Sequence, residues 1–510
     1  MIERFDPRRH LAWGAGKRSA VPSNGAAGHP FLQLIRSLDR VRSRHTAIFG
    51  DIGTGKTTLI QILLLIDISR RLKGESPAGF AVVDVVGDLT RDMLARIGII
   101  RSGLDPEKRR LLDRLIYVVD PKMEGRTPAY DLFDLMPGET PEKRADDIAL
   151  TIQVVEQDDP RITVRVKATL KHGCLALIVT GRQFRDLPRL LREAEFRDRV
   201  VEESRHPKLQ AFFRFQFPTN EQKVRERVES SLNRLGLLFD NDVEDFLTGP
   251  STFNLAKAMD DGAFIFFYFP SYKLGEEASY LLAALMMAEM HRMARQRLEM
   301  PESERKPFSI IADEFQLFAS ESILRMLEQD RKAKIQLVTG TQLVKGRPQE
   351  QHIRDAARSI ANTIISFRQP SESAVVLQPD LLSPKLRQIK HTTIRYQKVP
   401  GFFGEYTQLI EDPVFMGQDE IRNREIRKIT HLPDRHFWLR VRGEPYSLLV
   451  QSPNLKSIEE LAEPNTTKAL VAELIGVSDR RIGRPKYKAP PSIDPNAEYM
   501  FPAEHDQYGW

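Results

Sequence analysis

The chain carries Gly50-Asp51-Ile52-Gly53-Thr54-Gly55-Lys56-Thr57, which fills every position of the phosphate-binding pattern G-x-x-x-x-G-K-[ST]. Before it, Thr46-Ala47-Ile48-Phe49 is typical of a short buried strand, and residues 57–70 after it are typical of a helix. The glycines let the backbone curl around a polyphosphate, and the helix N-terminus adds partial positive charge. Lys56 is expected to reach the β- and γ-phosphates, and the Thr57 hydroxyl to bind Mg²⁺. The predicted site for ATP and Mg²⁺ comprises Gly50, Asp51, Ile52, Gly53, Thr54, Gly55, Lys56, Thr57 and Thr58.

The composition indicates a globular protein with two or three domains. The chain has 510 residues, of which 41% are hydrophobic and 29% charged, and this length exceeds one simple core. No apolar run approaches the roughly 18 residues that a membrane-spanning helix requires, and the charged residues 1–10 lack the apolar core of a signal peptide. Cys174 is the single cysteine, which excludes an intrachain disulfide and a cysteine-based zinc site. We therefore expect a cytoplasmic protein that does not insert directly into a membrane.

A β/α pattern runs through most of the chain and predicts an α/β fold. Apolar runs bounded by turn residues are spaced like the strands of parallel-sheet units, with helical segments between them. The run at residues 263–269 is continuous, which suits a strand covered on both faces. A hairpin is expected over residues 437–450, with its turn near Gly443. The other expected strands are residues 80–84, 115–119, 308–312, 335–339 and 363–367.

Residues 141–247 have a different character. Strand signals fade there, and charged segments with helical periodicity take over, which predicts an all-α domain inserted into the α/β domain. The expected domains are an irregular N-terminal arm (1–40), a discontinuous nucleotide-binding motor domain (41–140 and 248–465), the inserted all-α domain (141–247) and a basic, Pro-rich C-terminal tail (466–510).

A second motif, Phe308-Ser309-Ile310-Ile311-Ala312-Asp313-Glu314, is an apolar strand that ends in two acidic residues, as a Walker B element does. Asp313 is expected to hold Mg²⁺ through its water shell, and Glu314 to polarise the attacking water as the general base. On its own, an apolar strand that ends in two acidic residues is often an ordinary strand followed by a turn. Together with a complete phosphate-binding loop in the same chain, it predicts hydrolysis of the bound nucleotide.

A third polar element follows one β/α unit later, where residues 335–339 lead into Gly340-Thr341-Gln342. An amide at the tip of the strand beside Walker B can touch both the γ-phosphate and the attacking water. Gln342 is therefore a candidate sensor of the nucleotide state, although a lone Gln at a strand end is more often an ordinary turn residue.

Together these motifs resemble the conjugative coupling proteins of type IV secretion, the TraD/TrwB-like family of the HerA/FtsK superfamily. The resemblance implies a RecA-like P-loop motor domain with an inserted all-α domain, a hexameric ring of subunits, and DNA as the substrate that the ring pumps. It covers roughly residues 40–455 and rests on Arg44-His45, Val83-Asp84, Gly87-Asp88, Asp313-Glu314-Phe315, Arg331-Lys332-Ala333-Lys334-Ile335 and Gly340-Thr341-Gln342.

The resemblance also implies catalytic roles for two arginines. By this match Arg331 is the arginine finger that reaches the ATP of the neighbouring subunit, and Arg44 is a second arginine near the same interface. A guanidinium suits the charge that spreads over the γ-phosphoryl oxygens in the transition state. Without the resemblance, Arg331 lies in a charged segment with Asp330 and Lys332, and is typical of a surface arginine.

The sequence departs from the family in two places. Coupling proteins usually begin with membrane-spanning helices, which have no counterpart here, and the glycine common after the Arg-Lys-Ala stretch is Lys334. We therefore expect a soluble ring-forming ATPase that hydrolyses ATP at subunit interfaces to move DNA, as HerA does when it drives DNA into a nuclease. Two alternatives stay open. One is a coupling ATPase that recruits a relaxase–DNA complex, and the other is a nucleotide-gated scaffold that remodels a protein partner without gripping DNA.

The C-terminal segment is a further candidate for binding DNA. The formal net charge of +6 is compatible with a polyanionic partner but does not establish one. Gly483-Arg484-Pro485 among basic residues resembles the core of an AT-hook, whose arginine lies along a narrow minor groove. The simpler interpretation, which we favour, is a basic tail that holds phosphates without sequence preference or packs on a neighbour. The candidate DNA-binding residues are Arg480, Arg481, Arg484 and Lys486.

Overall fold

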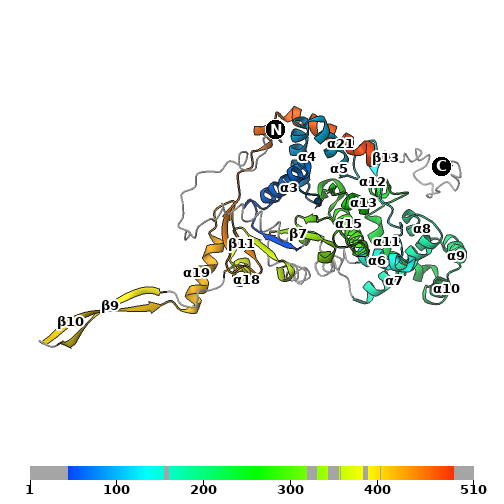
Figure 1. Cartoon of the computed structure of the whole chain (residues 1–510). Coiled ribbons are helices and arrows are strands. Elements are labelled where there is room, and N and C mark those ends of the chain that lie inside the picture. The colour runs from blue at the N-terminus through cyan, green and yellow to red at the C-terminus, as the bar shows by residue number, and fades with distance from the viewer. Residues whose placement is uncertain are drawn as a thin grey trace.

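The computed structural model has a nine-stranded sheet at its centre, flanked by helices, and a long two-stranded arm that extends away from the body (Figure 1). The residues that the structure describes are 44–153, 160–239, 241–318, 330–342, 355, 358–382, 389–401 and 404–486. The N-terminal arm expected over residues 1–40 lies outside them.

The central sheet has the strand order β12-β11-β8-β1-β7-β6-β2-β5-β3. Its strands from β8 to β3 pair in parallel, whereas β11 pairs antiparallel with both β8 and β12. The expected α/β class is confirmed. The strands of this sheet are β1 (Thr46–Phe49), β2 (Gly79–Asp84), β3 (Ile116–Val119), β5 (Phe264–Tyr268), β6 (Phe308–Ala312), β7 (Ile335–Thr341), β8 (Thr363–Ser366), β11 (His436–Val441) and β12 (Leu448–Gln451).

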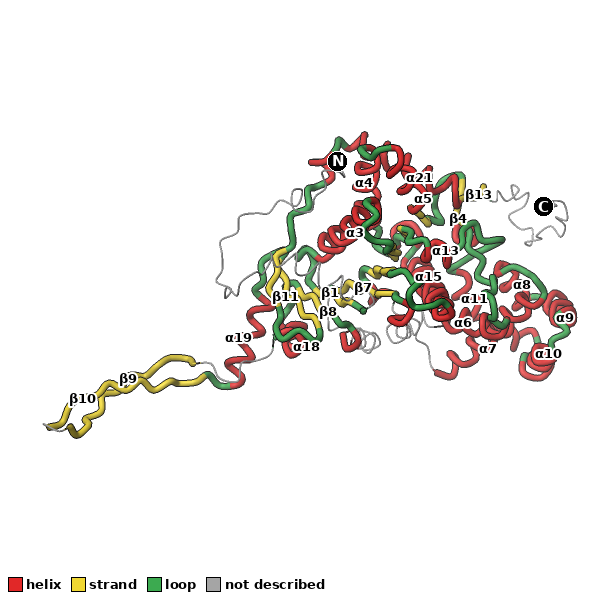
Figure 2. The backbone as a smooth tube through the Cα atoms, viewed as in Figure 1, coloured by secondary structure: helices red, strands yellow, loops and turns green. Residues whose placement is uncertain are grey.

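Helices cover both faces of the sheet, which explains the continuous apolar runs of its strands. Along β2, Phe80 and Val82 join one buried cluster with α3 and α4, whereas Ala81 and Val83 join the opposite cluster with α15. Figure 2 shows these helices in red around the yellow strands. Among the described residues, the α-helices outside the insertion are α3 (Lys56–Leu72), α4 (Asp88–Ser102), α5 (Pro106–Leu115), α13 (Leu255–Asp260), α14 (Ser271–Leu274), α15 (Glu276–Gln296), α18 (Ser371–Leu381), α19 (Gln418–Thr430), α20 (Ile458–Leu461) and α21 (Pro464–Ile482).

The described part of residues 141–247 is helical, and a buried ionic network joins it to the α/β domain. Arg144 donates to Glu289 of α15 at 2.7 Å, and Arg292 donates to Glu289 at 2.8 Å and to Glu139 at 2.6 Å. Burial raises the pKa of Glu289, but the two arginines outweigh it and lower this pKa to about 2. The α-helices of this region are α6 (Pro141–Gln153), α7 (Pro160–Val179), α8 (Leu187–Arg192), α9 (Ala194–Glu203), α10 (Pro207–Ala211), α11 (Glu221–Gly236) and α12 (Asn241–Phe246).

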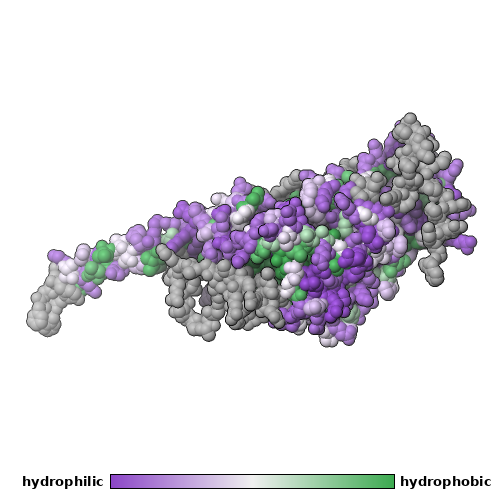
Figure 3. All heavy atoms as spheres, turned by 90° about the horizontal axis from the view of Figure 1, so that it is seen from above, coloured by the Kyte–Doolittle hydropathy of each residue, from purple (hydrophilic) through white to green (hydrophobic). Residues whose placement is uncertain are grey.

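The long arm was not expected from the sequence. It consists of β9 (Ile389–Gly401) and β10 (Gly404–Phe415), which pair with each other in an antiparallel ribbon. Tyr396 lies directly opposite Leu409 and is 72% exposed, while Leu409 is 48% exposed. Figure 3 shows apolar patches among polar residues along this arm. The hairpin expected near residues 437–450 is present as β11 and β12.

The C-terminal region differs from the expected tail. Residues 466–482 belong to α21, whose Leu474 is buried in the same cluster as α4, and β13 (Gly483–Pro485) pairs with β4 (Arg126–Pro128). The assignment of a tail from residue 466 is therefore wrong up to residue 485, because buried side chains and ladder hydrogen bonds hold this segment on the body. Among the described residues, no helix combines the length and the apolar character needed to cross a membrane.

Candidate nucleotide-binding and hydrolysis site

The phosphate-binding loop lies between β1 and α3, at the carboxyl edge of the sheet. Gly53 and Gly55 have φ angles of 72° and 110°, in the left-handed region that favours glycine. Gly50 is restricted by space, because a Cβ there would lie 2.8 Å from the Cβ of Phe367. Thr54 closes the turn by donating its hydroxyl to the Asp51 carbonyl at 2.7 Å. Ile52 and Gly53 are exposed at the top of the loop, and Thr58 is half-buried in the first turn of α3.

Lys56 crosses the inside of this loop. Its Nζ donates to the carbonyl oxygens of Gly50 at 2.7 Å and Asp51 at 3.2 Å. Burial lowers the pKa of Lys56, and the carboxylates of Glu314, Asp313 and Asp51 oppose that shift. Phosphate oxygens are ionised and are therefore stronger acceptors than the two carbonyls. The lysine is thus placed to bind a phosphate group in the loop.

Asp313 follows β6 and faces the loop. The Thr57 hydroxyl donates to Asp313 Oδ2 at 3.4 Å, so the two expected Mg²⁺ ligands lie together. Burial, followed by the charges of Glu314 and Asp84, raises the pKa of Asp313 to about 7, while Lys56 opposes this. A divalent cation would favour the ionised carboxylate. The hydroxyl and the carboxylate are oxygen donors of the kind that Mg²⁺ prefers.

Gly340 was not singled out by the sequence analysis as a constrained position. It lies in β7 next to Asp313, and a Cβ at Gly340 would approach Asp313 Oδ1 to 2.3 Å. Any side chain there would push the carboxylate out of its position. The glycine therefore fixes where the metal ligand can lie.

Glu314 is held in place by two amides. Gln342 Nε2 donates to Glu314 Oε1 at 2.9 Å, and Gln316 Nε2 donates to the other carboxylate oxygen. The backbone of Glu314 has a φ of 51°, which is unfavourable for a residue with a side chain. Strained backbone of this kind is found at functional sites when the surrounding structure over-determines it. The candidate base and the candidate sensor are thus in direct contact.

Arg331 and Arg44 lie at the other edge of the sheet. Arg44 precedes β1 and donates to the side chain of Asn362 at 2.9 Å. Arg331 precedes β7, is exposed, and makes no side-chain hydrogen bond or ion pair within the described part of the chain. The seven residues of β7 span about 20 Å. Neither arginine is therefore placed beside the phosphate-binding loop of its own chain.

The turn that carries Arg331 is held in place by a buried contact. Asp330 is buried, and its carboxylate oxygens lie 2.9 and 3.0 Å from Nδ1 of His291 on α15. This contact fixes the start of the η5 turn (Asp330–Ala333) while Arg331 stays exposed. The arrangement presents the guanidinium to the surroundings of the molecule.

Two of the candidate DNA-binding arginines near the C-terminus make hydrogen bonds within the chain. Arg481 donates to the carbonyls of Arg114 and Ile116, and its guanidinium lies 4.0 Å from the ring centroid of Tyr117. Arg484 donates to the carbonyls of Asp245 and Thr248. Arg480 is exposed, and Lys486 is the last residue that the structure describes. The positions of Arg481 and Arg484 favour a structural role over contact with phosphates.

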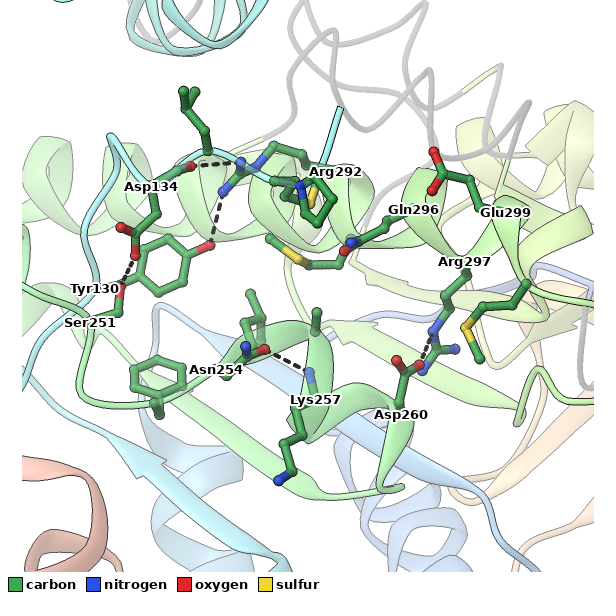
Figure 4. A pocket seen from close by; sticks show the side chains of 18 of the residues that line it. Tyr130, Asp134, Ser251, Asn254, Lys257, Asp260, Arg292, Gln296, Arg297 and Glu299 are labelled. Atoms are coloured by element: carbon green, nitrogen blue, oxygen red, sulfur yellow. Dashed lines mark hydrogen bonds and ion pairs between the residues drawn. The ribbon is translucent and has the colours of Figure 1, made fainter. Parts of the chain in front are cut away.

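A cavity of about 860 Å³ lies elsewhere, at the root of the inserted helices (Figure 4). Its two arginines are engaged within the chain, since Arg297 pairs with Asp260 at 2.8 Å and Arg292 donates to the Asp134 carbonyl at 3.0 Å. None of the phosphate-loop or Walker B residues line it. This cavity is therefore separate from the candidate hydrolysis site.

The comparisons with known proteins support the same fold. No family model matches the sequence, and no curated protein matches it. Three solved structures of the bacterial conjugative coupling protein TrwB match with a TM-score of 0.54 and 16% sequence identity: TrwBΔN70 in an unbound form, over 82% of this chain and 87% of that chain, TrwB with the GTP analogue GDPNP, over 82% and 88%, and TrwB with ADP and Mg²⁺, over 84% and 88%.

At this level of identity the similarity shows a shared fold. The chain has the fold of a TrwB-like coupling ATPase, and the expected RecA-like P-loop architecture is confirmed.

Proposed function

We propose, from the coupling-protein fold and the geometry of the site, that this chain is an ATPase that works as a ring and moves DNA in the cytoplasm. The observation that carries the proposal is the convergence of Lys56, Thr57, Asp313, Glu314 and Gln342 at the carboxyl ends of β1, β6 and β7. These side chains supply a phosphate-binding cation, two Mg²⁺ ligands, a base and a polar contact to that base.

Hydrolysis, rather than binding alone, is supported by Glu314. Lys56 and the loop would bind the β- and γ-phosphates, and Mg²⁺ held near Thr57 and Asp313 would neutralise the charge that develops on them. Glu314 would then accept a proton from the attacking water. A hydrogen bond from Gln342 holds this carboxylate in the site. TrwB, which shares the fold, has been solved with ADP and Mg²⁺.

Assembly into a ring is supported by the two arginines at the amino edge of the sheet. Arg331 lies too far along β7 to reach the γ-phosphate of its own chain, so a finger role requires a neighbouring subunit. The exposed guanidinium, anchored through Asp330 and His291, is available for such a contact. We propose that Arg44 lies near the same interface and that the ring is a hexamer.

A coupling role is the second candidate, and the inserted helices favour it. They form a layer that the Arg144–Glu289–Arg292 network and a shared buried cluster join to α15, which lies against the sheet. A relaxase bound to this layer would be mechanically linked to the ATPase domain, whereas a translocase of the HerA type would work with a nuclease. A scaffold that remodels a protein without touching DNA is the remaining alternative.

The test is the rate of ATP hydrolysis by the full chain with Mg²⁺, titrated with single-stranded and with double-stranded DNA. We expect at least one form to stimulate turnover, and we expect Lys56→Ala to abolish both basal and stimulated activity. A rate of ATP hydrolysis that neither form of DNA changes would reject the translocase in favour of the scaffold. A stimulated activity that rises further with a relaxase would favour the coupling role.

A further inference from the structure

Arg435 lies against the phosphate-binding loop from the side opposite Walker B. Its backbone N–H donates to the Thr54 carbonyl at 2.9 Å, and its own carbonyl accepts from the Ser452 N–H at 2.9 Å. The Cγ and Cα of Arg435 lie 3.4 and 3.5 Å from where a Cβ of Gly55 would be. The residue is therefore packed directly on the last glycine of the loop.

The backbone of Arg435 is in an unfavourable conformation. Its φ is 63°, in the left-handed region where glycine and asparagine are the usual residues. If this position only had to make a turn, glycine would make it with less strain. Since strained positions gather at functional sites, the side chain itself is the feature that needs an explanation.

The guanidinium of Arg435 has no partner within the described part of the chain. It makes no hydrogen bond, ion pair or ring contact there, although the residue is half-buried. The nearby carboxylate of Asp434 pairs instead with Arg368, at 3.0 Å. A partly buried guanidinium is well suited to an anionic or aromatic ligand.

The strand order gives the direction of that ligand. β1 lies between β7 and β8, and the γ-phosphate side of the loop faces β7 and β6, where Gln342, Asp313 and Glu314 lie. Arg435 precedes β11, which pairs with β8 on the other side. A nucleotide whose γ-phosphate lies toward Walker B extends its α-phosphate and nucleoside toward Arg435.

We propose that Arg435 binds the nucleotide of its own subunit, at the α-phosphate and nucleoside end. The proposal rests on the proposed function, because it requires that the loop binds a nucleotide. Under this proposal, the two arginines that bind one nucleotide come from different subunits. Arg435 serves the nucleotide in cis from the β8–β11 side, whereas Arg331 serves that of the neighbour.

The test uses Arg435→Gly, because glycine relieves the backbone strain and removes the guanidinium at once. We expect a melting temperature of the nucleotide-free protein at or above that of the parent, and a Kd for a fluorescent ADP that rises about 10- to 100-fold. Arg435→Asn, which also tolerates a positive φ, should behave alike. The matched control is Arg205→Gly, since Arg205 is an exposed arginine with a φ of 47° between α9 and α10, in the inserted helices. It should leave the Kd for ADP unchanged.

Two results would overturn the inference. One is a Kd for ADP in both Arg435 variants that matches the parent. The other is a loss of affinity accompanied by a lower melting temperature in both variants, which would give Arg435 a purely structural role. If the parent protein itself bound no ADP, the proposed function would fail, and the inference would fail with it.

Discussion

Gln342 at the end of β7 donates a hydrogen bond of 2.9 Å to Glu314, which follows β6. The contact joins the residue that would respond to the γ-phosphate to the residue that would activate water. If Gln342 exchanged Glu314 for a phosphate oxygen when ATP binds, the carboxylate would be released to accept a proton. Binding of ATP and activation of Glu314 as the base would then be coupled through the amide of Gln342.

Glu314→Gln is expected to keep ATP binding and to reduce hydrolysis by at least about 100-fold, because an amide is nearly isosteric with the carboxylate but cannot act as a base. Binding would be measured with a fluorescent ATP analogue and turnover by phosphate release. Glu304→Gln is a suitable control, since it makes the same change at an exposed glutamate outside the site and should leave turnover unchanged. Turnover at the parent rate in Glu314→Gln would place the base elsewhere.

The raised pKa of Asp313 predicts how the stability of the nucleotide-free protein depends on pH. Its folded-state pKa is raised from 3.8 to about 7, so between these values the folded state binds more protons than the unfolded state. The free energy of unfolding should therefore fall as the pH rises from about 4 to 7, by at most about 4 kcal/mol from this group.

Asp313→Asn should remove that contribution, so its stability should depend less on pH over this window and exceed the parent's at pH 8. Denaturant unfolding of both proteins at several pH values would measure it. Equal slopes for the two proteins would show that Asp313 is ionised in the folded state throughout this range.

Lys334 has a φ of 56°, and its carbonyl accepts a hydrogen bond from Phe308 that aligns β7 with β6. The coupling proteins that the sequence resembles commonly have glycine here, and the positive φ explains why. Lys334→Gly should therefore raise the free energy of unfolding by about 1 kcal/mol. The control is Lys332→Gly in the preceding η5 turn, which has no positive φ and should be destabilised. A loss of stability in Lys334→Gly would mean that its side chain contributes more than the strain costs.

The parts of the site that sequence reasoning found are those whose chemistry is contained in a short stretch. The phosphate-binding loop and the pair Asp313-Glu314 carry their residue types in sequence order, so their pattern can be recognised without the fold. Gly340 and Arg435 could not be found in this way. Gly340 is constrained by the carboxylate of Asp313, and Arg435 packs on Gly55, and in each pair the two residues are distant along the chain.

The two largest errors in the fold have a common cause. The prediction of a tail from residue 466 is dominated by the prolines and charges of residues 485–510 and overlooks the few buried residues, such as Leu474 and Ser478, that fix α21 to the body. Ser478 even accepts a hydrogen bond from the Val118 N–H in β3, at 2.8 Å. The two-stranded arm of β9 and β10 was not predicted because its apolar residues, such as Ile394, are scattered among charged ones on an exposed ribbon. Composition in a short window does not reveal a distant packing partner.

Arg331→Ala should leave ATP binding close to that of the parent and reduce turnover by roughly 10³- to 10⁵-fold, as the loss of an arginine finger does. Because Arg331 lies at the edge of the sheet away from its own loop, the missing charge belongs to the neighbour's site. Lys332→Ala is the matched control, since it removes an exposed cation from the same turn and should have little effect.

Mixed assemblies of Arg331→Ala and Glu314→Gln subunits give the sharper result. Each variant alone has every interface defective, but in a mixture some interfaces combine an intact Glu314 with an intact Arg331 from the next subunit. Partial recovery of phosphate release is therefore expected, with a maximum near equal proportions. Mass measurement must show that mixed rings have formed. If they have formed and no activity returns, Arg331 does not act in trans, because a finger in the neighbouring subunit would necessarily complement the intact base.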